Sequence, residues 1–127
     1  MESLGTHVIA EFYECDKKII EDVKLVEQLM VNAAKVTNAT IVDVIFHSFN
    51  PYGVSGMIVI AESHLAIHTW PEYNFASVDI YTCGNEVKPW KAYEYLETAF
   101  KSKNISVMEM KRGIMKAPNG ELKHKAE

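Results

Sequence analysis

The chain has 127 residues and a net charge of −4 at neutral pH; 48% of its residues are hydrophobic and 24% are charged. This length predicts a single domain over residues 1–127, large enough to bury one hydrophobic core. The acidic balance argues against a nucleic-acid-binding protein, which normally presents a basic face.

The sequence carries no signal for export or membrane insertion. Its start, Met1–Gly5, lacks a basic segment followed by an apolar stretch. The longest apolar run, Met57–Ala61, is far too short to span a bilayer. The two cysteines, Cys15 and Cys83, are too few for a disulfide framework, so we expect a cytoplasmic protein with free thiols.

In the first half of the chain, the spacing of apolar residues predicts a strand, a helix and a second strand. Apolar residues alternate through His7–Glu14, as in a strand with one buried face. Residues 22–37 carry apolar side chains at helical spacing, and Asp22 is a suitable N-cap. Thr40–Phe49 is rich in isoleucine and valine, which favours a strand.

The second half of the chain predicts three further strands, a helix that begins at Pro89 and a last strand. In chain order, we expect a turn at 50–53, strands at 54–61, 64–69 and 77–82, a helix at 89–101 and a strand at 106–110, followed by a polar, frayed tail at 117–127. Strands joined by short turns imply a mainly antiparallel sheet, and two amphipathic helices would cover one of its faces. The predicted fold is therefore an α/β (α+β) two-layer sandwich, whose uncovered sheet face would suit a homodimer.

Ser63 lies between Glu62 and His64 at the end of a very apolar strand. Its plainest interpretation is a polar strand end that enters a turn. The alternative is an activated serine, because a hydroxyl nucleophile needs a nearby base or a strained backbone. Ser55 lies eight residues earlier, and this even spacing would put both serines on one face of a regular strand.

His64 and His68 are four residues apart, a spacing that can bind a metal ion on a helix. In a strand the two share a face but lie roughly 13 Å apart, too far for one ion. No other cluster has metal-ligand spacing, so we predict no metal. A general base is the better functional interpretation of at least one histidine.

Two further groups could contribute to a site. Cys83 follows a strand, and it is either a small buried residue or a thiol that acts as an acid or nucleophile. Phe49, Trp70 and Glu72 combine aromatic rings with a carboxylate. Such residues most often belong to a core, but stacking and hydroxyl recognition are also what a purine nucleoside site requires.

Several motifs together closely resemble the small prokaryotic S-adenosylmethionine decarboxylases, over nearly the whole chain. The most specific are FHSFNPYGVSG at 46–56, AESHLAIHTWPE at 61–72 and YTCG at 81–84; Gly5–His7 and Arg112–Gly113 also match. The resemblance implies a proenzyme that cuts its own backbone between Glu62 and Ser63 to give a β chain, 1–62, and an α chain, 63–127.

The resemblance also assigns roles in this cleavage. Ser63 would attack the carbonyl of Glu62 and become a pyruvoyl group, with no need for a metal or pyridoxal phosphate. Ser55 would help to stabilise the intermediate of the acyl shift, and His68 would accept the α-proton of Ser63. Oriented donors and a base are both required for these steps.

For the decarboxylation, the resemblance implies a Schiff base between the pyruvoyl group and S-adenosylmethionine, and a product used for spermidine synthesis. Cys83 would donate the proton, Phe49 would stack on adenine and Glu72 would bind ribose; Leu65 and Trp70 would line the pocket. Homodimers of processed αβ units are implied, with Phe49 and Glu72 coming from the opposite protomer.

Two alternatives stay open. One is a decarboxylase of the same fold that acts on arginine or ornithine, although Phe49 and Glu72 favour the nucleoside substrate. The other is an inactive regulatory homologue. This second alternative predicts the loss of Ser63, His68 or Cys83, and all three are present.

Overall fold

The computed structural model describes residues 2–116 and 122–123, so most of the expected tail at 117–127 lies outside the described residues. Six strands form one sheet in the order β2-β3-β4-β5-β1-β6, and every neighbouring pair is antiparallel. The strands are β1 (Glu2–Tyr13), β2 (Thr40–Ser48), β3 (Val54–Ala61), β4 (Ser63–Trp70), β5 (Phe75–Cys83) and β6 (Asn104–Met115).

The helices are α1 (Lys17–Ile20), α2 (Val23–Val36) and α3 (Pro89–Ala99), with a 3-10 turn, η1 (Pro71–Tyr73). Asp22 caps α2 as expected, because its Oδ1 accepts from the backbone N–H groups of Lys24 and Leu25, both at 3.1 Å. The short helix α1 was not predicted; it is capped by Asp16, which accepts from Lys18 N.

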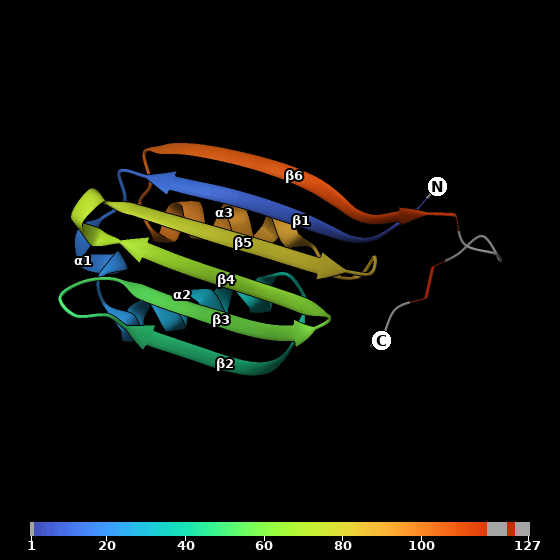
Figure 1. Cartoon of the computed structure of the whole chain (residues 1–127), viewed down its shortest axis with the longest axis horizontal. Helices are drawn as coiled ribbons and strands as arrows, with labels where there is room; N and C mark the ends of the chain where they lie inside the picture. The colour runs from blue at the N-terminus through green and yellow to red at the C-terminus, as the bar shows by residue number, and fades with distance from the viewer. Residues whose placement is uncertain (1, 117–121, 124–127) are drawn as a thin grey trace.

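Both long helices lie behind the sheet in Figure 1, and no helix of the described residues covers its front face. The two-layer α+β sandwich that the sequence predicts is therefore confirmed. The uncovered surface, called the open face below, carries the side chains that alternate away from the helices. Its side chains include Ser55, His68, Asp79, Tyr81 and Arg112.

The opposite face of the sheet is buried against α2 and α3. In β4, Leu65 and Ile67 are completely buried and alternate with the outward-facing residues 64, 66 and 68. Phe12 packs edge-on against Phe100 in the same core, with ring centroids 5.7 Å apart. The side chain of Leu65 therefore belongs to the hydrophobic core, and its expected part in lining a substrate pocket stays a prediction.

Because Leu65 is buried in the centre of the sheet, we expect Leu65→Ala to lower the free energy of unfolding by about 2–5 kcal/mol. The loss combines apolar burial with the cavity that is left behind. Urea titration followed by circular dichroism measures it. Val36→Ala is the matched control, because Val36 at the end of α2 is 46% exposed on the helix layer and should change stability by less than about 1 kcal/mol. Equal losses for the two variants would contradict the core position of Leu65.

Candidate active site

Ser63 is the first residue of β4 and follows a tight hairpin turn at Glu62. Its pairing partners are Ile60 on β3 and Thr82 on β5. The backbone φ of Ser63 is +101°, a left-handed value that is strained for any residue except glycine. The scissile bond expected from the sequence is thus at the end of a hairpin, on the amino side of a strained serine.

Cys83, the last residue of β5, lies directly beside this serine. Ser63 Oγ and Cys83 Sγ are 3.1 Å apart, within hydrogen-bonding distance. Strand alternation alone would turn Ser63 toward the helices together with Leu65, whereas Cys83 alternates with Tyr81 on the open face. The positive φ of Ser63 is the local departure from strand geometry that accompanies the contact.

A second pair lies at the other end of β4. Ser55 on β3 pairs in register with His68 on β4, and Ser55 Oγ is 2.7 Å from His68 Nδ1. A serine hydroxyl and an imidazole at this distance can orient one another and move a proton.

A shallow pocket of about 230 Å³ opens beside this second pair. Phe49, Trp70 and Glu72 are among its walls, and it is completed by Tyr52, Gly53, Ser55, His68 and Thr69. The ring of Phe49 contacts His47 edge-on, with centroids 4.7 Å apart.

Thr69 is a pocket residue that the sequence interpretation missed. Its hydroxyl accepts from the backbone N–H of Val54 at 2.9 Å and donates to the carbonyl of Ile20, also at 2.9 Å. The side chain therefore ties the start of β3 to α1. The available signal was a hydroxyl residue on the same strand face as the buried Leu65 and Ile67, two residues further along β4.

The two pairs, Ser63 with Cys83 and Ser55 with His68, do not meet within one chain. Ser63 and His68 are five residues apart on β4, which corresponds to about 16 Å along a strand. The even spacing of Ser55 and Ser63 did not make them neighbours, because the hairpin turn pairs Ser55 with His68 and Ser63 with Ile60. We call Ser63 with Cys83 the serine–cysteine half-site, and Ser55, His68 and the pocket the histidine half-site.

The other cysteine, Cys15, is a buried thiol of low reactivity. Cys15 is 4% exposed, and its thiol donates to the carbonyl of Phe12 at 3.4 Å. Burial raises the pKa of Cys15 to about 11, so at neutral pH it is a protonated thiol and a poor nucleophile. Both cysteines are free of disulfides.

His64, which follows Ser63 on the open face, is held in its neutral form. Burial is the main cause that lowers the pKa of His64, and His7 and Arg112 lower it further, while Asp79 acts in the opposite direction. The His64 ring lies edge-on to Tyr81, with centroids 5.8 Å apart. A neutral imidazole therefore lies next to Ser63 at physiological pH.

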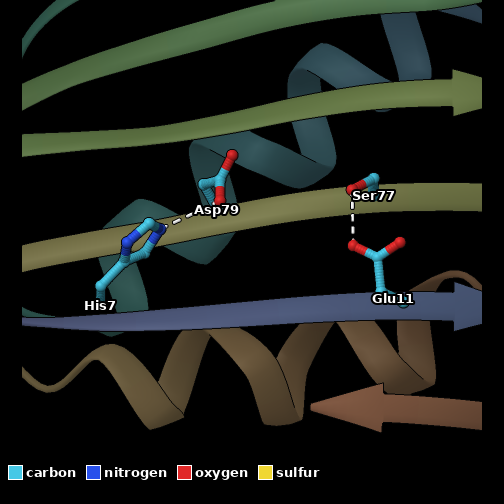
Figure 2. Close-up of polar contacts among 4 residues, drawn as sticks. All are labelled: His7, Glu11, Ser77 and Asp79. Atoms are coloured by element: carbon cyan, nitrogen blue, oxygen red, sulfur yellow. Dashed lines mark hydrogen bonds and ion pairs between the residues drawn. The ribbon is translucent and has the colours of Figure 1, made fainter. Parts of the chain in front are cut away.

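The middle of the open face carries polar pairs that link β1 to β5. Figure 2 shows His7 and Glu11 on β1 directed toward Asp79 and Ser77 on β5. His7 Nε2 lies 3.0 Å from Asp79 Oδ1, and the Ser77 hydroxyl donates to Glu11 Oε1 at 2.7 Å. These polar groups are already paired within one chain, so another surface could cover them without leaving them unsatisfied.

Within 2–116 and 122–123, no three histidine, cysteine or acidic side chains are grouped closely enough to hold a metal ion. In the same part of the chain, no helix has the length and apolar character needed to cross a membrane.

Comparison with known proteins places this fold and these residues in one class of enzyme. The family model described as S-adenosylmethionine decarboxylase matches residues 6–113. The solved structure of the adenosylmethionine decarboxylase from Aquifex aeolicus VF5 superposes on this chain with a TM-score of 0.86 at 36% identity, and the match covers 91% of this chain and 95% of that one.

Curated bacterial relatives of this chain carry the same family name. The S-adenosylmethionine decarboxylase proenzyme of Thermotoga petrophila is 58% identical over 113 residues, which covers 89% of this chain and 87% of the relative. The proenzyme of Thermodesulfovibrio yellowstonii is 53% identical over 125 residues, 98% of this chain and 93% of the relative. The chain belongs to the S-adenosylmethionine decarboxylase family, and it is an enzyme, as the sequence motifs predicted.

Proposed function

We propose that this chain is a proenzyme that cuts itself between Glu62 and Ser63 and then decarboxylates S-adenosylmethionine. The observation that carries the proposal is the strained Ser63 at the hairpin end, with its hydroxyl 3.1 Å from the Cys83 thiol, in a chain of this family. The products of processing are residues 1–62 and 63–127, and the decarboxylated product would supply aminopropyl groups for spermidine.

The cleavage uses only atoms of the chain and one water molecule. Ser63 Oγ attacks the carbonyl carbon of Glu62; the new C–O bond replaces the C–N bond, and an ester joins the two parts. Removal of the Ser63 α-proton then expels the Glu62 carboxylate from Cβ, which breaks the Cβ–Oγ bond. Water hydrolyses the remaining dehydroalanine to a pyruvoyl group and releases ammonia. The first step builds negative charge on oxygen, and the second requires a base.

The base and the serine come from different protomers in this proposal. The open faces of two protomers would pack against each other about a two-fold axis, with their β4 strands antiparallel. An axis that crosses β4 near Ala66, midway between Ser63 and His68, lays the serine–cysteine half-site of one chain over the histidine half-site of its partner. Ala66 has only a methyl side chain on this face, which permits close approach. Two equivalent sites result.

Side-chain chemistry on the open face supports such an interface. Its large apolar side chains are exposed in the isolated chain, among them Ile45, Met57, Met108 and Met110. The polar pairs of Figure 2 would be buried with their partners already in place. An apolar surface with satisfied polar groups is typical of permanent subunit interfaces.

The contact between Ser55 and His68 sets the tautomer that a base needs. If His68 accepts the α-proton through Nε2, then Nδ1 must carry the ring proton and donate to Ser55 Oγ, 2.7 Å away. Ser55 then orients the imidazole, in addition to its proposed part in stabilising the acyl-shift intermediate. This assignment makes Ser55 and His68 one functional unit.

The pocket supports a nucleoside substrate bound between two chains. Phe49 offers a ring for stacking on adenine, and Glu72 offers a carboxylate for the ribose hydroxyls. The pocket volume of about 230 Å³ is below the roughly 300–1,000 Å³ of typical ligand sites, as expected when one chain supplies only part of the walls. Trp70 lines the same pocket and would form a wall of the substrate site.

The residues around position 63 fit a pyruvoyl group, since the serine that would form it has a hydroxyl directed at a thiol and lies at a chain reversal. A pyruvoyl carbonyl supplies an electron sink for the α-carbon of a bound amino acid. Cys83 would hold the proton that this α-carbon receives after carbon dioxide leaves.

Cys83→Ala is accordingly expected to spare self-cleavage and to lower the turnover number for decarboxylation by about 100-fold or more, because a positioned proton donor is lost. Gel electrophoresis measures cleavage, and release of labelled carbon dioxide measures turnover. Cys15→Ala serves as the control, since Cys15 is buried away from both half-sites. Unchanged turnover in Cys83→Ala would remove Cys83 as the donor.

The substrate is tested by measuring carbon dioxide release from S-adenosylmethionine, arginine and ornithine in parallel. We expect activity on S-adenosylmethionine alone. The relatives reported above are named for that substrate and give no support to the arginine or ornithine alternative. Activity on an amino acid alone would overturn the substrate, and a cleaved protein without any activity would favour the regulatory homologue.

A further inference from the structure

Gly5 and Arg112 have no role in the mechanism above, yet both lie beside the serine–cysteine half-site. Gly5 on β1 pairs with Cys83 on β5 and, along its other edge, with Arg112 on β6. One row of residues therefore runs across three strands from Arg112 through Gly5 to Cys83, and Cys83 in turn contacts Ser63.

Gly5 leaves space that no other residue could leave. A Cβ atom at this position would lie 2.6 Å from Tyr81 Cε1, 2.8 Å from the backbone oxygen of Thr82 and 2.9 Å from Cys83 Sγ. These separations are below normal van der Waals contact, and the oxygen belongs to backbone that cannot rotate away. The ring of Tyr81 and the thiol of Cys83 therefore occupy their positions because residue 5 has no side chain.

Tyr81 uses this space to reach across β1. The strands β5 and β6 are separated by β1, so they lie about 10 Å apart. The guanidinium carbon of Arg112 is nevertheless 4.4 Å from the centroid of the Tyr81 ring. Ring and guanidinium meet by cation–π contact, and an aromatic side chain over a strand glycine restores packing that the glycine lacks.

Two histidine rings also pack against the ring of Tyr81 and restrict its position. His64 on β4 lies edge-on to it at 5.8 Å, and His7 on β1 packs at 5.5 Å between centroids. Tyr81 is two residues before Cys83 and points to the same face of β5. A ring fixed in this way limits the positions that the neighbouring thiol can take.

We propose that Gly5, Tyr81 and Arg112 form a brace that holds the Cys83 thiol against Ser63. They are positioning residues and act on the reaction through Cys83. Their effect on turnover rests on the proposed function, whereas the placement of the thiol can be measured whether or not the chain is a decarboxylase.

The placement is measured as the rate at which iodoacetamide alkylates Cys83 in the native protein, mapped by peptide mass. Cys15 does not interfere, because it is buried and its pKa is about 11. In Tyr81→Leu, we expect Cys83 to react about ten-fold faster, as for a thiol released from a packed position. Tyr81→Phe keeps the ring and should stay within about two-fold of wild type, since the contacts involve the ring and not the hydroxyl. Gly5→Ala and Arg112→Met should resemble Tyr81→Leu.

A matched control separates the brace from loss of a dimer. Met57→Asp places a charge on the open face on β3, away from Gly5, Tyr81 and Arg112, and gives the alkylation rate that dissociation alone produces. The brace predicts rates in Tyr81→Leu and Gly5→Ala above that of Met57→Asp, together with a lower turnover number at a nearly unchanged KM.

Two results would overturn the brace: equal alkylation rates in wild type, Tyr81→Leu and Gly5→Ala, or a Tyr81→Phe protein that reacts as fast as Tyr81→Leu. Failure of the proposed function looks different, because the wild-type chain would then stay uncut or inactive while the alkylation comparison still holds.

Discussion

Ser63→Ala is expected to leave the chain uncut and without decarboxylase activity, because alanine has no oxygen to attack the Glu62 carbonyl. The fold should survive. Ser63 is at a strand end, and alanine at φ +101° carries a backbone strain similar to that of serine. Denaturing electrophoresis should therefore show only full-length chain, and thermal unfolding should occur within a few degrees of wild type.

Two controls make this prediction specific. Ser106→Ala removes an exposed serine of β6 that belongs to neither half-site, and it should cut itself normally. Ser63→Cys keeps a nucleophile at position 63 and should retain slow cleavage, because a thiol can also attack the carbonyl. Cleaved product from a folded Ser63→Ala chain would show that another residue starts the reaction.

The second prediction concerns self-cleavage in heterodimers of two variants that each lack one half of the site. Ser63→Ala and His68→Ala should each fail to cut as homodimers, since one lacks the nucleophile and the other lacks the base. When they are co-expressed with different tags and purified as heterodimers, one site combines Ser63 of the His68→Ala chain with His68 of the Ser63→Ala chain. That site is complete, so the chain that carries alanine at 68 should be cut.

The heterodimer experiment is decisive because the two half-sites lie far apart within one chain. Ser63 and His68 of one chain are about 16 Å apart along β4, so a complete site within one chain is not expected. The heterodimer of Ser63→Ala with Cys83→Ala is the matched control. Both residues belong to the same half-site, so this mixture should contain no site with both Ser63 and Cys83, and decarboxylation should stay low. A purified Ser63→Ala and His68→Ala heterodimer with no cut chain would contradict the assembly of the site across two protomers.

Most of the fold could be predicted because it follows from local patterns. Alternating apolar residues in β1 and the i, i+4, i+7 stripe of α2 are signals that each element carries by itself. The length of β6 was underestimated from the sequence, because a strand was predicted at 106–110 and the observed strand spans Asn104–Met115. That strand is an exposed edge of the sheet, and among the described residues it pairs with β1 alone, about 100 residues away along the chain. The residues of β6 also alternate weakly between buried and exposed positions.

The sequence singled out the residues of the candidate site, whose roles stay predictions, but it did not predict how these residues are arranged. Ser55, Ser63, His68 and Cys83 were expected to act together, and all of them lie on three neighbouring strands. Which of them touch depends on the register of the hairpin between β3 and β4, which spacing along the chain does not reveal. The brace was missed for a similar reason, because Gly5, Tyr81 and Arg112 meet only when β1 lies between β5 and β6.

Intact mass spectrometry of the purified wild-type protein tests the central claim most directly. The account predicts two chains, one with the mass of residues 1–62 ending in a normal carboxylate, and one with that of residues 63–127 lighter by one ammonia than a chain that begins with serine. Only the full-length mass after prolonged incubation would contradict self-cleavage before Ser63.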